Sequence, residues 1–293
     1  MMSDPVTRRT VLKQLALVGA GLPLAGNLVS ARAAETAPAT PVPALKPAFQ
    51  FGVATVSLKS LPLENALAAV HRVGLDRISL HRAHSPWENS PAAWRDIAAK
   101  IKAAGITVAC CGVLYLKNEE AAMRRMFEYV RALGLPFFSC SVEPPGLPLL
   151  EKLVKEYDLR AAIHNHGPED KVWPSPDLIW QAIQPLDERI GLCLDIGHAY
   201  RAGSDPAASI RAFRHRLYDV HLKDSAAAVG AEDIPVEIGR GVIDERAVLT
   251  ALMEIGYDRN AWFEYEKDPN DPVPGLAESV GYIRGLLKGM GAA

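Results

Sequence analysis

Short apolar segments alternate with longer amphipathic ones from residue 51 to residue 290, and the alternation repeats eight times. The short segments are almost continuously apolar, which is typical of parallel strands that are covered on both faces. Several of the longer segments end in a glycine that can adopt the left-handed conformation in which helices stop. The expected strands are 51–58, 75–80, 106–114, 137–142, 159–163, 190–194, 217–222 and 261–265, and the expected helices are 62–73, 91–104, 119–133, 147–157, 176–183, 205–216, 245–256 and 275–290.

Eight strand–helix units in about 240 residues predict a single α/β domain, a (β/α)8 TIM barrel, over residues 50–290. An open doubly wound sheet is the alternative, but it does not usually need eight regular repeats. No glycine-rich phosphate loop follows an early strand. The composition is that of a globular domain, with 49% hydrophobic and 23% charged residues, and four cysteines in apolar runs predict buried free thiols. The formal net charge of −2 gives no electrostatic reason to expect a nucleic acid partner.

The first 33 residues have the three regions of an export signal in the usual order. Arg8 and Arg9 precede an apolar stretch from residue 15 to residue 29, and Ala31-Arg32-Ala33 has the small residues of a cleavage site. This pattern resembles a twin-arginine signal peptide, which implies the twin-arginine export machinery as a partner and a periplasmic protein. A basic amphipathic N-terminus is the alternative. Residues 34–49, rich in Ala, Pro and Thr, predict a linker, and no run predicts a permanent membrane span.

Polar residues gather where the later apolar strands end. The carboxyl ends of all strands of a barrel lie at one face, so we expect these side chains to meet. Imidazoles and carboxylates from different strands suit one divalent metal ion, and Mn²⁺, Zn²⁺, Co²⁺ or Fe²⁺ fits such a mixture better than Mg²⁺ or Ca²⁺. The residues expected there are Glu143, His164, Asn165, His166, Asp195, His198, His221, Lys223, Asp224, Glu264 and Glu266.

Three motifs at the last strand ends resemble those of the xylose-isomerase-like TIM-barrel family, which includes sugar isomerases, sugar 3-epimerases, inosose dehydratases and endonuclease IV. They are Leu194-Asp195-Ile196-Gly197-His198, Val220-His221-Leu222-Lys223-Asp224 and Phe263-Glu264-Tyr265-Glu266. The resemblance extends over about residues 50–290. It implies that Asp195, His221 and Glu264 bind metal.

The fifth strand departs from the family pattern. Many members have a metal-binding Glu where this chain has His164. One interpretation makes His164 the fourth ligand, since imidazole is a common ligand of transition metals. The other is a rearranged site in which Glu143 takes part. The change also puts the two-glutamate proton shuttle of the epimerases in doubt, so the candidate catalytic bases are Glu143, His166 and Glu266.

A metal at this rim can polarise a carbonyl while a neighbouring base moves a proton. The resemblance therefore implies a metal-dependent sugar isomerase or epimerase. A lyase or dehydratase that acts on a keto sugar or inosose is the closest alternative, and an inactive sugar-binding barrel is the second. Side chains expected to contact substrate are those of His84, His198, Lys223 and Arg240; His81 is a further candidate for lining the pocket.

Overall fold

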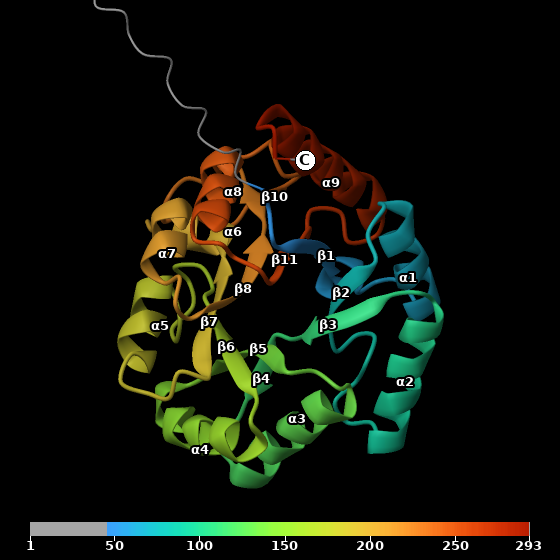
Figure 1. Ribbon diagram of the computed structural model, residues 1–293, viewed down its shortest axis with the longest axis vertical. Coiled ribbons are helices and arrows are strands. Elements are labelled where there is room, and N and C mark those ends of the chain that lie inside the picture. The colour runs from blue at the N-terminus through green and yellow to red at the C-terminus, as the bar shows by residue number, and fades with distance from the viewer. Residues whose placement is uncertain (1–45, 293) are drawn as a thin grey trace, which may run out of the picture. The chain divides into compact units, whose positions relative to one another are not determined.

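The computed structural model describes residues 46–292 and confirms the predicted (β/α)8 TIM barrel (Figure 1). The predicted signal peptide, its cleavage site and most of the predicted linker lie outside this range. Among the described residues, no helix is both long and apolar enough to cross a membrane.

The barrel wall is one parallel sheet in the order β3-β2-β1-β11-β8-β7-β6-β5-β4. Closure requires the first strand to meet the last, and β1 pairs in parallel with β11 through Gln50↔Asn260 to Val53↔Phe263. The strands are β1 (Gln50–Ala54), β2 (Arg77–Leu80), β3 (Thr107–Cys111), β4 (Leu114–Leu116), β5 (Phe137–Val142), β6 (Arg160–His164), β7 (Ile190–Asp195), β8 (Leu217–Leu222) and β11 (Asn260–Phe263).

The third strand of the expected eight is split in two. β3 pairs with β2, and β4 pairs with β5, so together they occupy one position in the barrel wall. The break lies at Gly112, whose φ of 153° is one that side-chain-bearing residues rarely adopt. A Cβ at Gly112 would also clash with Ser139. The sequence pattern predicted one continuous strand over 106–114, and Gly112 within it was the one sign of this break.

The helices form a ring outside the strands (Figure 1). They are α1 (Leu63–Arg72), α2 (Pro91–Ala103), α3 (Glu120–Ala132), α4 (Leu147–Tyr157), α5 (Pro176–Ile183), α6 (Ile196–Arg201), α7 (Pro206–Ala212), α8 (Glu245–Glu254) and α9 (Pro272–Gly289). Gly74, Gly105, Gly134 and Gly256 have φ between 63° and 78°, as expected for glycines that end helices. Helix α6 was not expected: it begins directly after β7 because Asp195 caps it, accepting a 2.8 Å hydrogen bond from the His198 amide. A short hairpin of β9 (Asp224–Ser225) and β10 (Pro235–Val236) was also not expected.

Side-chain alternation along the strands places the expected ligands on the inner face of the barrel. Successive residues of a strand point to opposite faces, so Cys193 and Asp195 share one face of β7, and Asp219 and His221 share one face of β8. Leu192 and Leu194, on the other face of β7, belong to the main hydrophobic core beneath the helices. The last inward position of each late strand thus carries a polar side chain.

Glu245 gives a prediction about stability. Its side chain begins α8, is 2% exposed, and neither carboxylate oxygen has a hydrogen-bond partner among the described residues. Burial, together with nearby Asp224 and Asp244, raises the pKa of Glu245 well above its usual value. The folded state therefore binds this proton more tightly than the unfolded state. The free energy of unfolding consequently falls as pH rises above the unfolded pKa.

We expect Glu245→Gln to increase the free energy of unfolding by about 1–2 kcal/mol at pH 8, because glutamine cannot ionise. The gain should shrink at pH 5, where Glu245 is already protonated. Thermal unfolding at both pH values measures it. The exposed Glu128→Gln serves as the control and should change neither melting temperature. An equal or lower melting temperature for Glu245→Gln at pH 8 would contradict the prediction.

Candidate active site

Four of the expected metal ligands converge at the carboxyl end of the barrel. His164, Asp195, His221 and Glu264 each offer one ligand atom, and these four atoms lie within 4.8 Å of one another. They come from β6, β7, β8 and the end of β11, which are consecutive in the sheet. The register sets Asp195 directly beside His221. The cluster borders a hollow of about 160 Å³.

Several buried polar atoms in this cluster have no hydrogen-bond partner among the described residues, which tests whether the cluster fits a metal ion. His164 is buried, and neither of its ring nitrogens has a hydrogen-bond partner within residues 46–292; the same holds for Asp195 Oδ2. Asp195 Oδ2 lies 3.8 Å from His164 Nε2 and 4.0 Å from His198 Nε2, too far for hydrogen bonds. Buried polar atoms are rarely left unpaired, and a cation among them would satisfy several at once. The residues present therefore fit a divalent metal.

Protonation states agree with this fit. Burial, reinforced by the neighbouring imidazoles of His221 and His166, holds the pKa of His164 well below its usual value, so its ring is neutral and able to bind metal. His221 differs. Burial opposes its charge, but the 2.7 Å hydrogen bond to Glu264 Oε2 and other nearby carboxylates raise its pKa to about 9. A proton is thus held between His221 and Glu264, where a cation could replace it.

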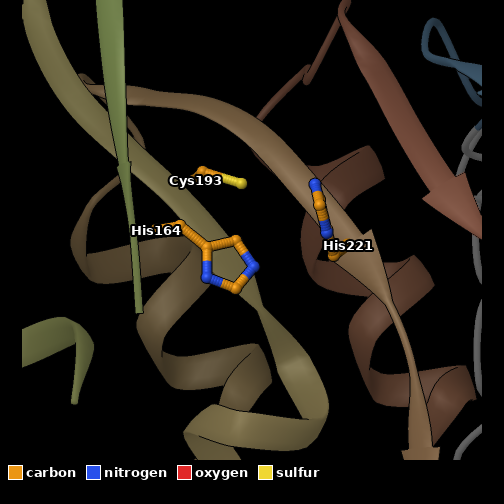
Figure 2. Close-up of side chains that lie close together, drawn as sticks. All are labelled: His164, Cys193 and His221. Atoms are coloured by element: carbon orange, nitrogen blue, oxygen red, sulfur yellow. The ribbon is translucent and has the colours of Figure 1, made fainter. Parts of the chain in front are cut away.

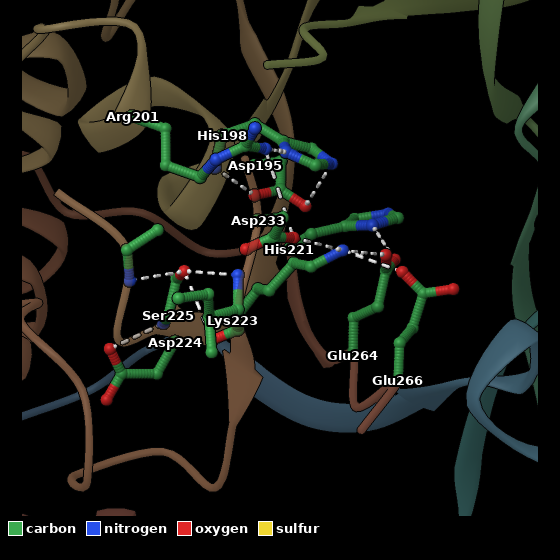
Figure 3. A network of polar contacts seen from close by, with 12 residues as sticks. Asp195, His198, Arg201, His221, Lys223, Asp224, Ser225, Asp233, Glu264 and Glu266 are labelled. Carbon is green, nitrogen blue, oxygen red and sulfur yellow. Dashed lines mark hydrogen bonds and ion pairs between the residues drawn. The ribbon is translucent and has the colours of Figure 1, made fainter. Parts of the chain in front are cut away.

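Lys223 lies beside the His221–Glu264 pair and neutralises the carboxylates of Glu264 and Glu266 (Figure 3). Its Nζ donates to Glu264 Oε1 at 3.2 Å and to Glu266 Oε2 at 2.7 Å, and its side chain is 3% exposed. Burial alone would raise the pKa of Glu264, but Lys223 and His221 hold it well below the usual range. The expected contact of Lys223 with substrate stays a prediction, and in the structure its ammonium group is paired with Glu264 and Glu266.

Asn165 holds Asp195 in place, and Asp219 lies beneath His221. Asn165 clamps Asp195, accepting from its amide and donating to its carbonyl, both at 3.0 Å. Asp219 is fully buried one inward position below His221, with Oδ2 3.9 Å from His221 Nε2. Its other oxygen accepts from Trp262 Nε1 at 2.5 Å. Burial raises the pKa of Asp219 to about 6.

Cys193 also lies beside the imidazoles of His164 and His221 (Figure 2). All four cysteines are free and buried, as predicted. Burial, with Asp219 nearby, raises the pKa of the Cys193 thiol well above its usual value, and its Sγ lies 3.7 Å from Asp219 Oδ2. Only a thiolate is a good metal ligand. The nitrogen and carboxylate set is therefore the better metal site.

Arg201 fixes the tautomer of His198. Arg201 is 1% exposed and its Nη1 donates to His198 Nδ1 at 3.2 Å. Arginine cannot accept, so Nδ1 carries the lone pair and a neutral His198 holds its proton on Nε2. That nitrogen lies 4.0 Å from Asp195 Oδ2, and His198 lines the pocket. His198 is thus placed to donate a hydrogen bond to a bound molecule. Arg201 is itself held by Glu169 and by the Ala231 carbonyl.

His166 also lines the pocket, and its ring centroid lies 6.0 Å from that of His198. Its ring centroid is 4.8 Å from that of His164, and its Nε2 contacts the Tyr115 hydroxyl at 3.4 Å. Its Nδ1 is 3.3 Å from Asp170 Oδ2. Burial lowers the pKa of His166, and Asp170 partly offsets this. A neutral imidazole next to the metal cluster can accept a proton.

The other expected residues divide between the pocket and its surroundings. Glu266 lines the pocket, as does His81, whose pKa burial and His84 lower to about 4. His84 itself points away and bonds to the Leu61 carbonyl at 3.1 Å. Glu143 is exposed and lines a neighbouring hollow. His84 and Glu143 therefore lie outside the metal pocket.

Arg240 also lies elsewhere: its side chain is 58% exposed and pairs with Glu278 of α9. The glycine-flanked loop around it is organised by Asp224. The buried Asp224 carboxylate accepts hydrogen bonds from the amides of Gly239 at 2.9 Å and Gly241 at 2.8 Å. A side chain at position 241 would collide with Asp224. The glycines therefore serve the loop itself.

Comparisons with known proteins agree with the fold. The pattern of the family described as "Xylose isomerase-like TIM barrel" matches residues 67–286. An inosose dehydratase of Clostridium tetani is 30% identical over 142 residues, which cover 42% of this chain and 46% of that one, so the chain matches less than half of the length of this relative. A D-tagatose 3-epimerase-like protein superposes with a TM-score of 0.66 at 16% identity, covering 83% of this chain and 98% of that one. An L-ribulose 3-epimerase has a TM-score of 0.65 at 18% identity, with 83% and 95% coverage.

Proposed function

The chain belongs to the xylose isomerase-like TIM-barrel family, and from this we propose that it is a metal-dependent sugar isomerase or epimerase that moves a proton on a carbon next to a carbonyl. The observation that carries the proposal is the cluster of His164, Asp195, His221 and Glu264, with its unsatisfied buried atoms. Relatives of known activity act on sugars or cyclitols, which supports a polyhydroxylated carbonyl compound as substrate.

His164, Asp195, His221 and Glu264 would hold the metal. When bound, it polarises the substrate carbonyl and so acidifies the neighbouring C–H group. The protein supplies the rest. Lys223 keeps Glu264 ionised, and the His198 Nε2 proton is directed at a substrate oxygen by the bond from Arg201.

Two groups are placed to transfer protons. His166 follows β6 and Glu266 follows β11, and β7 and β8 lie between these strands, so the two approach the pocket from different sides. Glu266 is held by Lys223 at 2.7 Å and by Lys59 at 3.3 Å. A pair of this kind can remove a proton from one face of a carbon and return one to the other face, as epimerisation requires.

Dehydration of a keto sugar or inosose is the second candidate, and the similarity to an inosose dehydratase favours it. The first step would be the same: loss of the proton next to the carbonyl. His166 or Glu266 would then donate a proton to the departing hydroxyl group. The two reactions separate at this second step.

We further propose that the enzyme works in the periplasm after twin-arginine export, which the sequence pattern of residues 1–33 supports. The site composition is compatible with Mn²⁺, Zn²⁺, Co²⁺ or Fe²⁺. Metal loaded before export would remain with a protein that crosses the membrane folded.

Metal removal tests the central proposal. We expect a chelator to abolish incorporation of solvent deuterium into aldoses, ketoses or inososes, and a stoichiometric divalent ion to restore it. Mass spectrometry or NMR of the recovered sugar measures the exchange and separates epimer from dehydrated product. A protein that binds sugars but exchanges no proton when loaded with each of the four metals would instead be a binding protein.

A further inference from the structure

A second hollow of about 550 Å³ adjoins the metal pocket, and Tyr115 lines both. The metal pocket, at about 160 Å³, is smaller than typical small-molecule sites, which have about 300–1,000 Å³. The second hollow is itself within that range, so a ligand that extends into it has the room of a typical site. The wall between them is made of Tyr115, His166 and Asp170, which contact one another at 3.3–3.4 Å.

We propose that this second hollow binds a further ring of the substrate, so that the enzyme acts on a sugar that carries a second, uncharged ring rather than on a free monosaccharide or a sugar phosphate. The inference rests on the proposed function, because it assumes that the reacting ring occupies the metal pocket. It also assigns a role to Glu143, which lines the second hollow and not the first.

Tyr115 supplies the flat surface that a sugar ring needs. Its side chain is 61% exposed although it lies at the pocket mouth, and its ring is inclined by only 19° to that of His166. The His166 ring therefore lies against one face of the Tyr115 ring and holds that ring parallel to the wall between the two hollows. Exposed aromatic rings whose hydroxyl is already engaged are suited to apolar contact with a ligand.

The polar lining suits hydroxyl groups. Glu143 begins the short helix η2 (Pro144–Gly146), but its carboxylate makes no capping bond, and Glu119 likewise does not cap α3. Asn118 adds an amide that can both donate and accept. Leu116, Val142 and Val172 also line the hollow. A lining of both polar and apolar groups matches the two kinds of surface on a sugar ring.

Charge excludes an anionic substituent. Glu119, Glu143 and Asp170 line the hollow, against Lys117 as the one cation among its lining residues. Phosphate would therefore meet a negative surface, and like charges across a contact are unfavourable. A neutral glycosyl group meets no such penalty.

Calorimetric titration of the Mn²⁺-saturated protein with four related ketoses tests the inference. D-fructose presents one ring; turanose and isomaltulose carry a glucosyl group at O3 and O6, and D-fructose 6-phosphate carries phosphate at O6. We expect at least one disaccharide to bind about tenfold more tightly than fructose, as one or two added contacts of about 1 kcal/mol predict. The phosphate should bring no gain.

Tyr115→Ala and Glu143→Ala should each reduce the advantage of the disaccharide over fructose, whereas Tyr282→Ala, a tyrosine 43% exposed on α9, should leave it unchanged. Retained melting temperatures show that the variants fold. The inference is overturned if all four probes bind with equal affinity or if the disaccharides fail to bind. It is also overturned if the advantage of the disaccharide over fructose survives in both variants. Phosphate binding as tight as isomaltulose overturns the requirement for an uncharged ring. If the advantage is found but no probe exchanges deuterium, the proposed catalysis fails and the second-ring site stands.

Discussion

Replacing His164 with alanine is expected to remove the metal and the activity together. His164 is buried, its ring is neutral, and neither nitrogen has a hydrogen-bond partner within residues 46–292. Loss of a residue that merely orients a ligand already weakens metal binding by about 10–100-fold, so loss of a ligand should cost at least about 100-fold. Metal analysis after dialysis, together with deuterium exchange, measures both effects.

Two further variants sharpen this result. His164→Glu restores the residue that many family members have there, and it should keep a metal while shifting preference toward Mn²⁺ or Mg²⁺, since carboxylates favour harder cations. The exposed His215→Ala should change nothing. If His164→Ala kept a full complement of metal and lost only the rate, His164 would be a proton-transfer group and the four-ligand site would be wrong.

The sequence was sufficient to predict that these four side chains converge, because the placement of each one is local. A parallel strand that ends in an inward-facing polar residue can be recognised from five or six consecutive residues. Closure of the barrel then brings the strand ends together. His164, Asp195, His221 and Glu264 each obey this rule. The barrel itself follows from the same periodicity, repeated eight times.

The neighbours of those ligands could not be predicted in this way, because partners far along the chain determine them. Lys223 is turned inward by Glu264 and Glu266, and Arg240 outward by Glu278, at separations of 38 to 43 residues. Nothing near either cation indicates which carboxylate it will meet. Asp219 is comparable: it interrupts an apolar strand, which was a usable signal, but its partner Trp262 comes from β11.

His166→Gln is expected to retain the metal and to slow proton exchange. His166 contacts Tyr115 and Asp170 and lies beside the cluster without being one of its four closely spaced groups. Glutamine keeps a polar side chain there but cannot accept the proton, and general acid–base groups contribute about 10²–10⁴-fold. Metal content should equal that of the parent protein. Parallel loss of metal would make His166 a ligand instead.

Glu266→Gln, compared with His166→Gln on the same substrate, distinguishes the two candidate reactions. In an epimerase with one base on each side of the carbon, removal of one base stops inversion, yet the other still exchanges the proton on its own face with solvent. One variant would then introduce deuterium into the substrate without forming the epimer.

In a dehydratase a single group removes the proton, so loss of that group stops the exchange. Loss of the acid leaves the exchange running and stops only the departure of the hydroxyl group. Epimerisation is therefore supported if each variant still exchanges the proton of one epimer with solvent but not that of the other. Exchange lost in one variant for every substrate, with a dehydrated product in the parent protein, supports elimination. Full activity in both variants would remove His166 and Glu266 from the mechanism.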